Sequence, residues 1–273
     1  HTSQATDMLD QITTANTAVV SRPDSAVPLV GPQAGDALDL FDGNRGNLVR
    51  LDVRPSELFT VSASWAPDGE DDAFDAAVRF SHEAGGFRLA AGAGYRQGVI
   101  VNSAGFSGVI PQSTLDIKVL SAVASVMHLQ SGLFVTGFYG DISGDALAAF
   151  TTPKFDVDGM GWAVTGGLEQ KWFSVGKTTV FGEYGNVTLD AGRSVTTLGV
   201  TTYERANIDV TYWGGGIVQR LSDAETDVYA TIRQYSADGV AARGSTGGEV
   251  SGERGTLLDA NATVGMLGAR VRF

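Results

Sequence analysis

Apolar and polar residues alternate with a period of two along most of this chain, beginning near residue 47. In residues 59–65 (FTVSASW), for example, apolar side chains occupy every second position. Successive side chains of a β-strand point to opposite faces, so this period indicates strands with one apolar and one polar face. The expected strands cover residues 48–54, 59–65, 74–81, 87–96, 114–128, 131–141, 159–172, 177–189, 207–220, 226–236 and 261–273.

Two stretches, residues 120–139 and 212–219, carry apolar residues in both phases, which bulges or tight packing would explain.

The connections between the expected strands alternate between short and long. Those at 55–57, 83–85, 129–130, 173–176 and 222–225 are short, and those at 66–72, 98–113, 142–158, 190–206 and 237–260 are longer and polar. A meander with tight turns at one end is typical of an outer-membrane barrel, whereas a soluble sandwich needs crossover connections.

Composition narrows the class of protein further. Nowhere do about 18 apolar residues follow one another, which argues against a membrane-spanning helix. The chain contains no cysteine, and its formal net charge is -12, which argues against nucleic-acid binding because phosphates require clustered Lys and Arg. The sequence therefore predicts an all-β protein, a transmembrane antiparallel meander β-barrel located in a bacterial outer membrane.

Aromatic residues stand near the ends of several expected strands in the apolar phase, as in the interfacial girdle of a membrane barrel. They are Phe59, Trp65, Phe74, Phe80, Phe87, Tyr95, Trp162 and Trp172. A soluble barrel with large core residues near its ends is the alternative, but the apolar phase contains many Ala and Gly residues. The chain begins at His1 without an initiator Met, and its last strand finishes on Phe273.

The stretch LVRLDVRPSELFTVSASWAPDGEDDAFDAAVRFSHEAGGFRLAAGAGYRQ resembles the central strands of general porins from alphaproteobacteria. The segments VMHLQSGLFVTGFYG, SVGKTTVFGEYG and GARVRF are similar as well. The resemblance implies a barrel of the sixteen-stranded type that forms a homotrimer in the outer membrane of a Gram-negative bacterium. It also implies contact with lipid and lipopolysaccharide, and a water-filled channel for small hydrophilic solutes and ions.

Eleven strands are an odd number, whereas bacterial single-chain barrels close with an even one. In the family, five strands precede a long loop that folds into the lumen, and residues 1–46 resemble this loop. We therefore expect residues 1–46 to be a lumenal constriction loop, residues 47–273 to be barrel strands, and the first five strands to be missing from this sequence. Alternatively, 17–21 or 27–31 is a twelfth strand, although the prolines at 23, 28 and 32 weigh against regular pairing.

Four arginines lie in the inward, polar phase of what we take to be four successive strands, and we expect them to line the constriction of the pore: Arg50, Arg79, Arg88 and Arg96. Opposite them we expect four acids of the inward loop: Asp7, Asp10, Asp36 and Asp39. Acid on one side and base on the other would create a transverse field that favours polar solutes over apolar ones. Alternatively, these arginines serve only to solvate the wall.

Asp36, Asp39 and Asp42 recur at every third position and could supply oxygen ligands to Ca²⁺, the only cofactor that the sequence suggests. The spacing is not that of an EF-hand, and Arg45 and Arg50 could equally neutralise these carboxylates. Catalytic motifs such as HExxH, GxSxG and the phosphate-binding loop do not occur, so we do not expect an enzyme. The expected function is general diffusion of solutes, and the alternative is a non-conducting structural or adhesive barrel that anchors surface material.

Overall fold

The computed structural model describes residues 2–3, 15, 41, 45–67, 72–102, 113–148, 155–197, 200–246 and 254–271. Regular structure in these ranges is almost entirely β-strand, with one short turn of 3-10 helix at Ser222–Ala224. Within the same ranges, no helix has the length and apolar character needed to cross a membrane.

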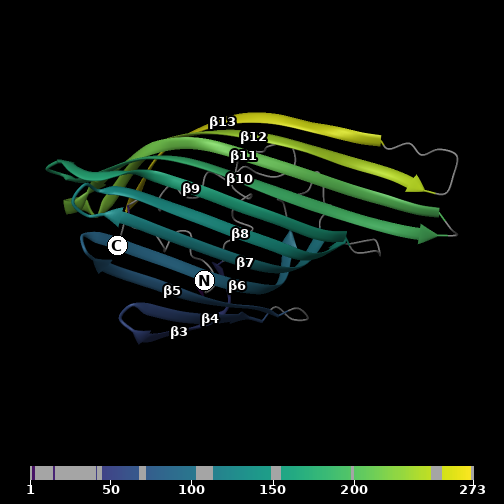
Figure 1. Ribbon diagram of the computed structural model, residues 1–273, viewed down its shortest axis with the longest axis horizontal. Helices are drawn as coiled ribbons and strands as arrows, with labels where there is room; N and C mark the ends of the chain where they lie inside the picture. Colours follow the sequence, from purple (N-terminus) through teal and green to yellow (C-terminus); the bar gives the residue numbers. More distant parts are fainter. Residues whose placement is uncertain are drawn as a thin grey trace.

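The main strands of the described chain form one antiparallel sheet of eleven, and their spatial order follows the sequence (Figure 1). They are β3 (Val49–Ser56), β4 (Phe59–Ala66), β5 (Ala73–Ala84), β6 (Phe87–Asn102), β7 (Ser113–His128), β8 (Leu133–Ala148), β9 (Phe155–Phe173), β10 (Gly176–Thr197), β11 (Val200–Leu221), β12 (Thr226–Thr246) and β13 (Arg254–Val271). Among the described residues, β3 and β13 are the two terminal strands of this sheet, and the short strands β1 (Thr2–Ser3) and β2 (Arg45–Gly46) form a separate pair.

The predicted all-β meander is confirmed, but several strands are longer than expected. The clearest error is the loop predicted at 190–206, because β10 and β11 pair continuously from Thr178↔Gln219 to Thr197↔Val200. The outer positions of β10 beyond Tyr184 are polar, namely Asn186, Thr188 and Asp190, whereas Val187 and Leu189 on the inner face are buried. A strand that has left the hydrocarbon layer lacks the apolar outer phase that marks a membrane strand, so the sequence there resembles a loop.

The sheet has two faces, which we call outer and inner. The outer face exposes large apolar side chains on every strand, including Leu51, Val135 and Leu267. Phe87 and Tyr95 on this face are eight residues apart on β6, about 27 Å along the strand, or about 20 Å across a membrane at the usual tilt. Other outer-face aromatics extend the same two rows: Phe59 and Trp172 near the short turns, and Trp65, Phe74, Tyr139, Trp162, Tyr184 and Trp213 at the far side.

The outer face changes character beyond the row that ends in Tyr184 and Trp213. There β10 and β11 carry polar side chains that bond across the two strands, since the Asn186 amide donates to Asp209 at 2.7 Å and the Asn207 amide donates to Asp190 at 2.7 Å. This polar ladder starts directly after the aromatic row, so it lies outside the apolar belt.

The inner face holds the core of the molecule. A large cluster of buried residues extends from β7 to β13 and includes Ile117, Phe138, Val187 and Tyr235, together with Phe41. A smaller cluster nearer the short turns joins Ala15 with Met127, Phe134, Phe181 and Val218. Two residues of the segment before β3 are thus packed on the inner face, while the expected assignment of residues 1–46 as a lumenal loop stays a prediction.

Candidate functional site

The inner face of β3, β4 and β5 carries a connected polar network. Arg50 Nε lies 3.0 Å from Oδ1 of Asp52 on the same strand. The Ser62 hydroxyl on β4 donates to Asp52, and Arg79 Nη1 on β5 donates to Ser62 Oγ at 2.9 Å. The network joins two of the predicted arginines through one carboxylate and one hydroxyl, because period-two alternation places all four side chains on the same face.

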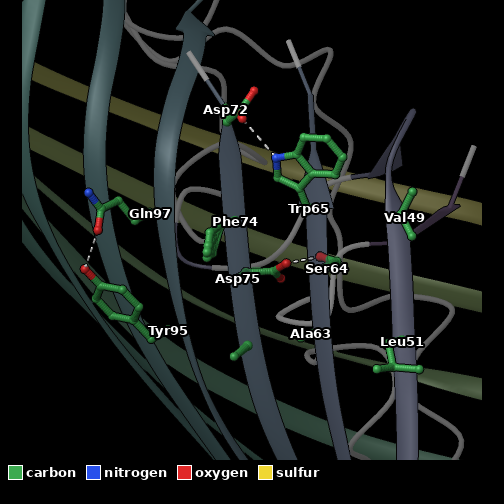
Figure 2. Close-up of a pocket in the computed structure, with 11 residues that line it drawn as sticks. Val49, Leu51, Ala63, Ser64, Trp65, Asp72, Phe74, Asp75, Tyr95 and Gln97 are labelled. Atoms are coloured by element: carbon green, nitrogen blue, oxygen red, sulfur yellow. Dashed lines mark hydrogen bonds between the residues drawn. The ribbon is translucent and has the colours of Figure 1, made fainter.

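Asp75 on β5 and Arg96 on β6 lie beside this network. The two residues are directly opposite each other in the β5–β6 register, and they are only 2% and 3% exposed. The Ser64 hydroxyl donates to Asp75 from β4, as Figure 2 shows. Charges of both signs are thus held at one level of the inner face, where burial strengthens their interaction.

Arg88 does not belong to this group. It lies on β6 beside the short turn, and its Nε is 2.6 Å from Oε1 of Glu83 on β5. Arg88 and Arg96 are eight residues apart on one strand, about 27 Å, so the two cannot act at the same level. The four arginines also come from three strands, because β4 contributes the serines and β6 contributes two arginines.

The predicted acids of the segment before β3 lie outside the described residues: Asp7, Asp10, Asp36 and Asp39. The same is true of the third predicted calcium ligand, Asp42. In the described ranges, no group of three or more His, Cys, Asp or Glu residues could hold a metal ion.

A buried ion pair on the far side of the inner face was not among the predicted site residues. Arg233 on β12 binds Glu183 on β10 through two nitrogens, with Nη2 at 2.9 Å from Oε2, and the Arg233 side chain is 2% exposed. The strand between them places Gly214 opposite both residues, and a Cβ there would lie 2.7 Å from Arg233 Cγ. Because Gly214 has no side chain, the Arg233 side chain can cross over β11 to reach Glu183. The register position of Gly214 between two charged residues is the sequence signal that could have revealed the pair.

A hollow of about 910 Å³ lies along β3 to β6 and is shown in Figure 2. Its lining is mainly outer-face and apolar, with Leu51, Trp65, Phe74 and Tyr95, and its polar contacts are among its own residues. Trp65 Nε1 donates to Asp72 at 3.1 Å, and the Tyr95 hydroxyl donates to Gln97 at 3.2 Å. Such a surface accommodates hydrocarbon.

No protein-family model matches the sequence, and no match is found among the curated proteins. Among solved structures, the chain is similar to the ferric yersiniabactin uptake receptor FyuA from Yersinia pestis, with a TM-score of 0.46 and 8% identity. This similarity covers 81% of the chain and 41% of the receptor, so the chain spans about two fifths of that protein. The β domain of the Bordetella autotransporter BrkA has a TM-score of 0.35 and 12% identity, covering 80% of this chain and 94% of that one. These low scores carry no conclusion about what this chain does.

The location of the protein follows from its own surface. An extended apolar outer face, two aromatic rows and an inner face with buried charges are the reverse of a water-soluble sheet, whose exposed side is polar. Strands of this kind, arranged as an antiparallel meander, are the wall of an outer-membrane β-barrel, and the chain is a protein of the bacterial outer membrane.

Proposed function

We propose that this protein is a passive channel for small hydrophilic solutes and ions, and that solutes pass along the inner face of β3 to β6. The observation that supports this is the Arg50–Asp52–Ser62–Arg79 network, with Asp75 and Arg96 beside it. Polar groups of both signs on the inside of a membrane barrel replace part of the hydration of a passing solute. No chemical step is needed, so the proposal is transport and not catalysis.

The general-porin resemblance adds further proposals. It implies a homotrimer in contact with lipid and lipopolysaccharide, and it makes the arginines of β3, β5 and β6 part of a constriction. Fixed charges at a narrow, low-dielectric point select solutes more strongly than charges at the mouth, which salt screens beyond about 8 Å.

Planar-bilayer recording on the purified full chain tests the channel. We expect stepwise conductance, with triplet closing steps if three pores assemble. The double substitution Arg79→Ser and Arg96→Ser should shift the reversal potential in a salt gradient toward cations, because positive charge leaves the wall. An unchanged reversal potential would show that these arginines do not line the passage.

A structural or adhesive barrel is the second candidate, and one observation favours it. The inner face of β7 to β13 is largely buried, with Val218 and Tyr235 almost fully covered, as in a filled interior. A protein with this function should insert into bilayers as a folded barrel and give no current steps. Electrical silence of correctly inserted protein would therefore overturn the channel proposal in favour of this one.

A further inference from the structure

Two glycines face each other in the middle of the inner face, Gly140 on β8 and Gly161 on β9, and they are direct partners in the sheet. A Cβ on Gly140 would lie 2.5 Å from the Cβ of Phe41 and 2.6 Å from its ring. A Cβ on Gly161 would lie 2.6 Å from Cε2 of the same ring. Phe41 is 1% exposed, so one aromatic side chain fills the space that two missing side chains leave.

Other inner-face glycines are covered from within the sheet. The ring of Tyr212 lies over Gly185, and the ring of Tyr229 lies over Gly268, each from the directly opposite position on the next strand. An aromatic residue beside a glycine in a neighbouring strand shields the exposed backbone of the glycine. This arrangement occurs in two pairs of strands, β10–β11 and β12–β13. In each pair one strand supplies the glycine and its partner supplies the aromatic ring.

The Gly140–Gly161 pair cannot be covered in that way, because both partners are glycine. Its ring comes instead from Phe41, which lies outside the eleven-stranded sheet. Phe41 precedes Val49, the first residue of β3, by eight positions, yet it contacts strands five and six places further along the sheet. The contact therefore ties the start of the sheet to its middle across the interior.

The surroundings of this contact are apolar and closed. Phe138 and Ile142 on β8 and Val187 on β10 belong to the same buried cluster as Phe41. A ring in such a cluster excludes water from the wall around it, whereas the network of β3 to β5 keeps exposed polar atoms such as those of Asp52.

We propose that the Gly140–Gly161 pair is a docking socket for Phe41, and that Phe41 is the positioning residue that narrows the interior on the β8–β9 side. The docked side chain directs solutes to the opposite, polar wall of β3 to β6. The effect on solute passage rests on the proposed channel function, whereas the docking contact itself does not.

Disulfide trapping tests the docking. The sequence contains no natural cysteine, so any disulfide must form between the introduced residues. The variant F41C/G140C should form an intramolecular disulfide on mild oxidation of the folded protein, detected by peptide mass, once the two Cβ atoms move apart by about 1 Å to the usual disulfide spacing. The variant F41C/G137C should form none, because Gly137 is on the same strand with open space at its Cβ position. The variant S125C/T136C is the positive control, since these hydroxyls are 2.6 Å apart on paired strands. If the positive control forms its disulfide and F41C/G140C does not, the socket is wrong.

Single-channel recording tests the positioning role. Phe41→Ala should shift the conductance to larger values, because it removes the ring that narrows the interior. Gly161→Ala should shift it to smaller values, because a Cβ there would lie 2.6 Å from Cε2 of Phe41 and would push the ring away from the wall, further into the interior. Phe41→Leu should restore most of the wild-type value, and Gly137→Ala should match wild type. If F41C/G140C forms its disulfide but Phe41→Ala leaves the conductance unchanged, the socket stands and the positioning role is overturned. If wild-type protein gives no current, the channel proposal fails, while disulfide trapping still decides the docking.

Discussion

The inner wall of β3 to β6 and the inner wall of β7 to β13 lie in one sheet and have the same outer surface, but their side chains differ. The first presents Arg50, Asp52, Asp75 and Arg96 at neighbouring positions, where the Asp52 side chain is 46% exposed and Asp75 and Arg96 are buried. The second presents Val, Ile, Phe and Tyr side chains that are buried. Its ion pairs include Arg233–Glu183, Lys177–Glu169 and Arg270–Asp227. We call the first wall the water-facing half, because its network reaches solvent at Asp52, and the second the covered half, because its side chains form a buried cluster.

The difference teaches that the inward phase of a membrane strand has two distinct uses. Where water fills the interior, charges remain solvated, and each contributes little to stability. Where side chains fill the interior, every polar group must be paired, and removing one partner is expensive. The two halves should therefore respond very differently to similar substitutions.

The largest expected effect is on the covered half. Arg233→Met leaves Glu183 buried without its partner and should lower the free energy of unfolding by about 3–5 kcal/mol. Replacing both, as Glu183→Gln with Arg233→Met, should recover most of that loss. Urea titration of the protein in lipid vesicles measures both values. A double variant as unstable as the single one would contradict the view that an uncompensated charge causes the loss.

A smaller effect is expected at the glycines of the covered half. Gly185→Ala places a Cβ 2.5 Å from the ring of Tyr212, and the resulting strain should destabilise the protein by about 1–3 kcal/mol. Gly137→Ala on the outer face of β8 is the matched control, since it meets open space there. Because alanine suits a strand better than glycine, the control should gain about 0.5–1 kcal/mol in the same titration. Equal stabilities for the two variants would show that the inner face is not tightly packed.

In the water-facing half, Asp52→Asn should cost only about 1 kcal/mol, because the Asp52 side chain is 46% exposed and water replaces the lost interactions. The same unfolding experiment compares it with Arg233→Met. A loss as large as that of Arg233→Met would show that water is excluded equally from both halves. That result would contradict the distinction between a water-facing and a covered half.

The smallest effect is expected at the turn end of β6. Arg88→Ser removes an ion pair whose two side chains are 35% and 55% exposed, so the free energy of unfolding should change by about 0.5 kcal/mol or less. The reversal potential of the Arg88→Ser variant should also remain close to that of wild type, in contrast to that of the Arg79→Ser and Arg96→Ser double variant. A shift as large as that of the double variant would indicate that Arg88 lines the constriction.

Much of the fold follows from the period of two, because that pattern depends only on the neighbouring positions of one strand. It gave the strand order and the outer face, and it placed Arg50, Arg79 and Arg96 on one side. It was ambiguous in residues 120–139, where the structure shows apolar side chains on both faces: Leu120 and Val135 outside, and Val123 and Phe138 inside. Lipid covers the first pair and buried side chains cover the second, so both phases are apolar for different reasons.

The parts of the site that the sequence did not reveal depend on contacts between distant residues. The Arg233–Glu183 pair spans two strand spacings, and it forms only because Gly214 lies between them. Phe41 reaches β8 and β9 from a segment in which no periodic pattern indicates a binding partner. Alternation indicates which face of the sheet a residue occupies, but it does not indicate which distant residues pack against that face.

The length of the hairpin formed by β10 and β11 has a consequence for the profile of the molecule. Each of these strands has 22 residues, whereas β3 and β4 have 8. A membrane crossing takes about 9–11 residues, so the hairpin rises roughly 30 Å beyond the hydrocarbon layer. The rim is therefore high on one flank and low on the other. A macromolecule that approaches the high flank meets the polar ladder of Asn186, Asp190, Asn207 and Asp209.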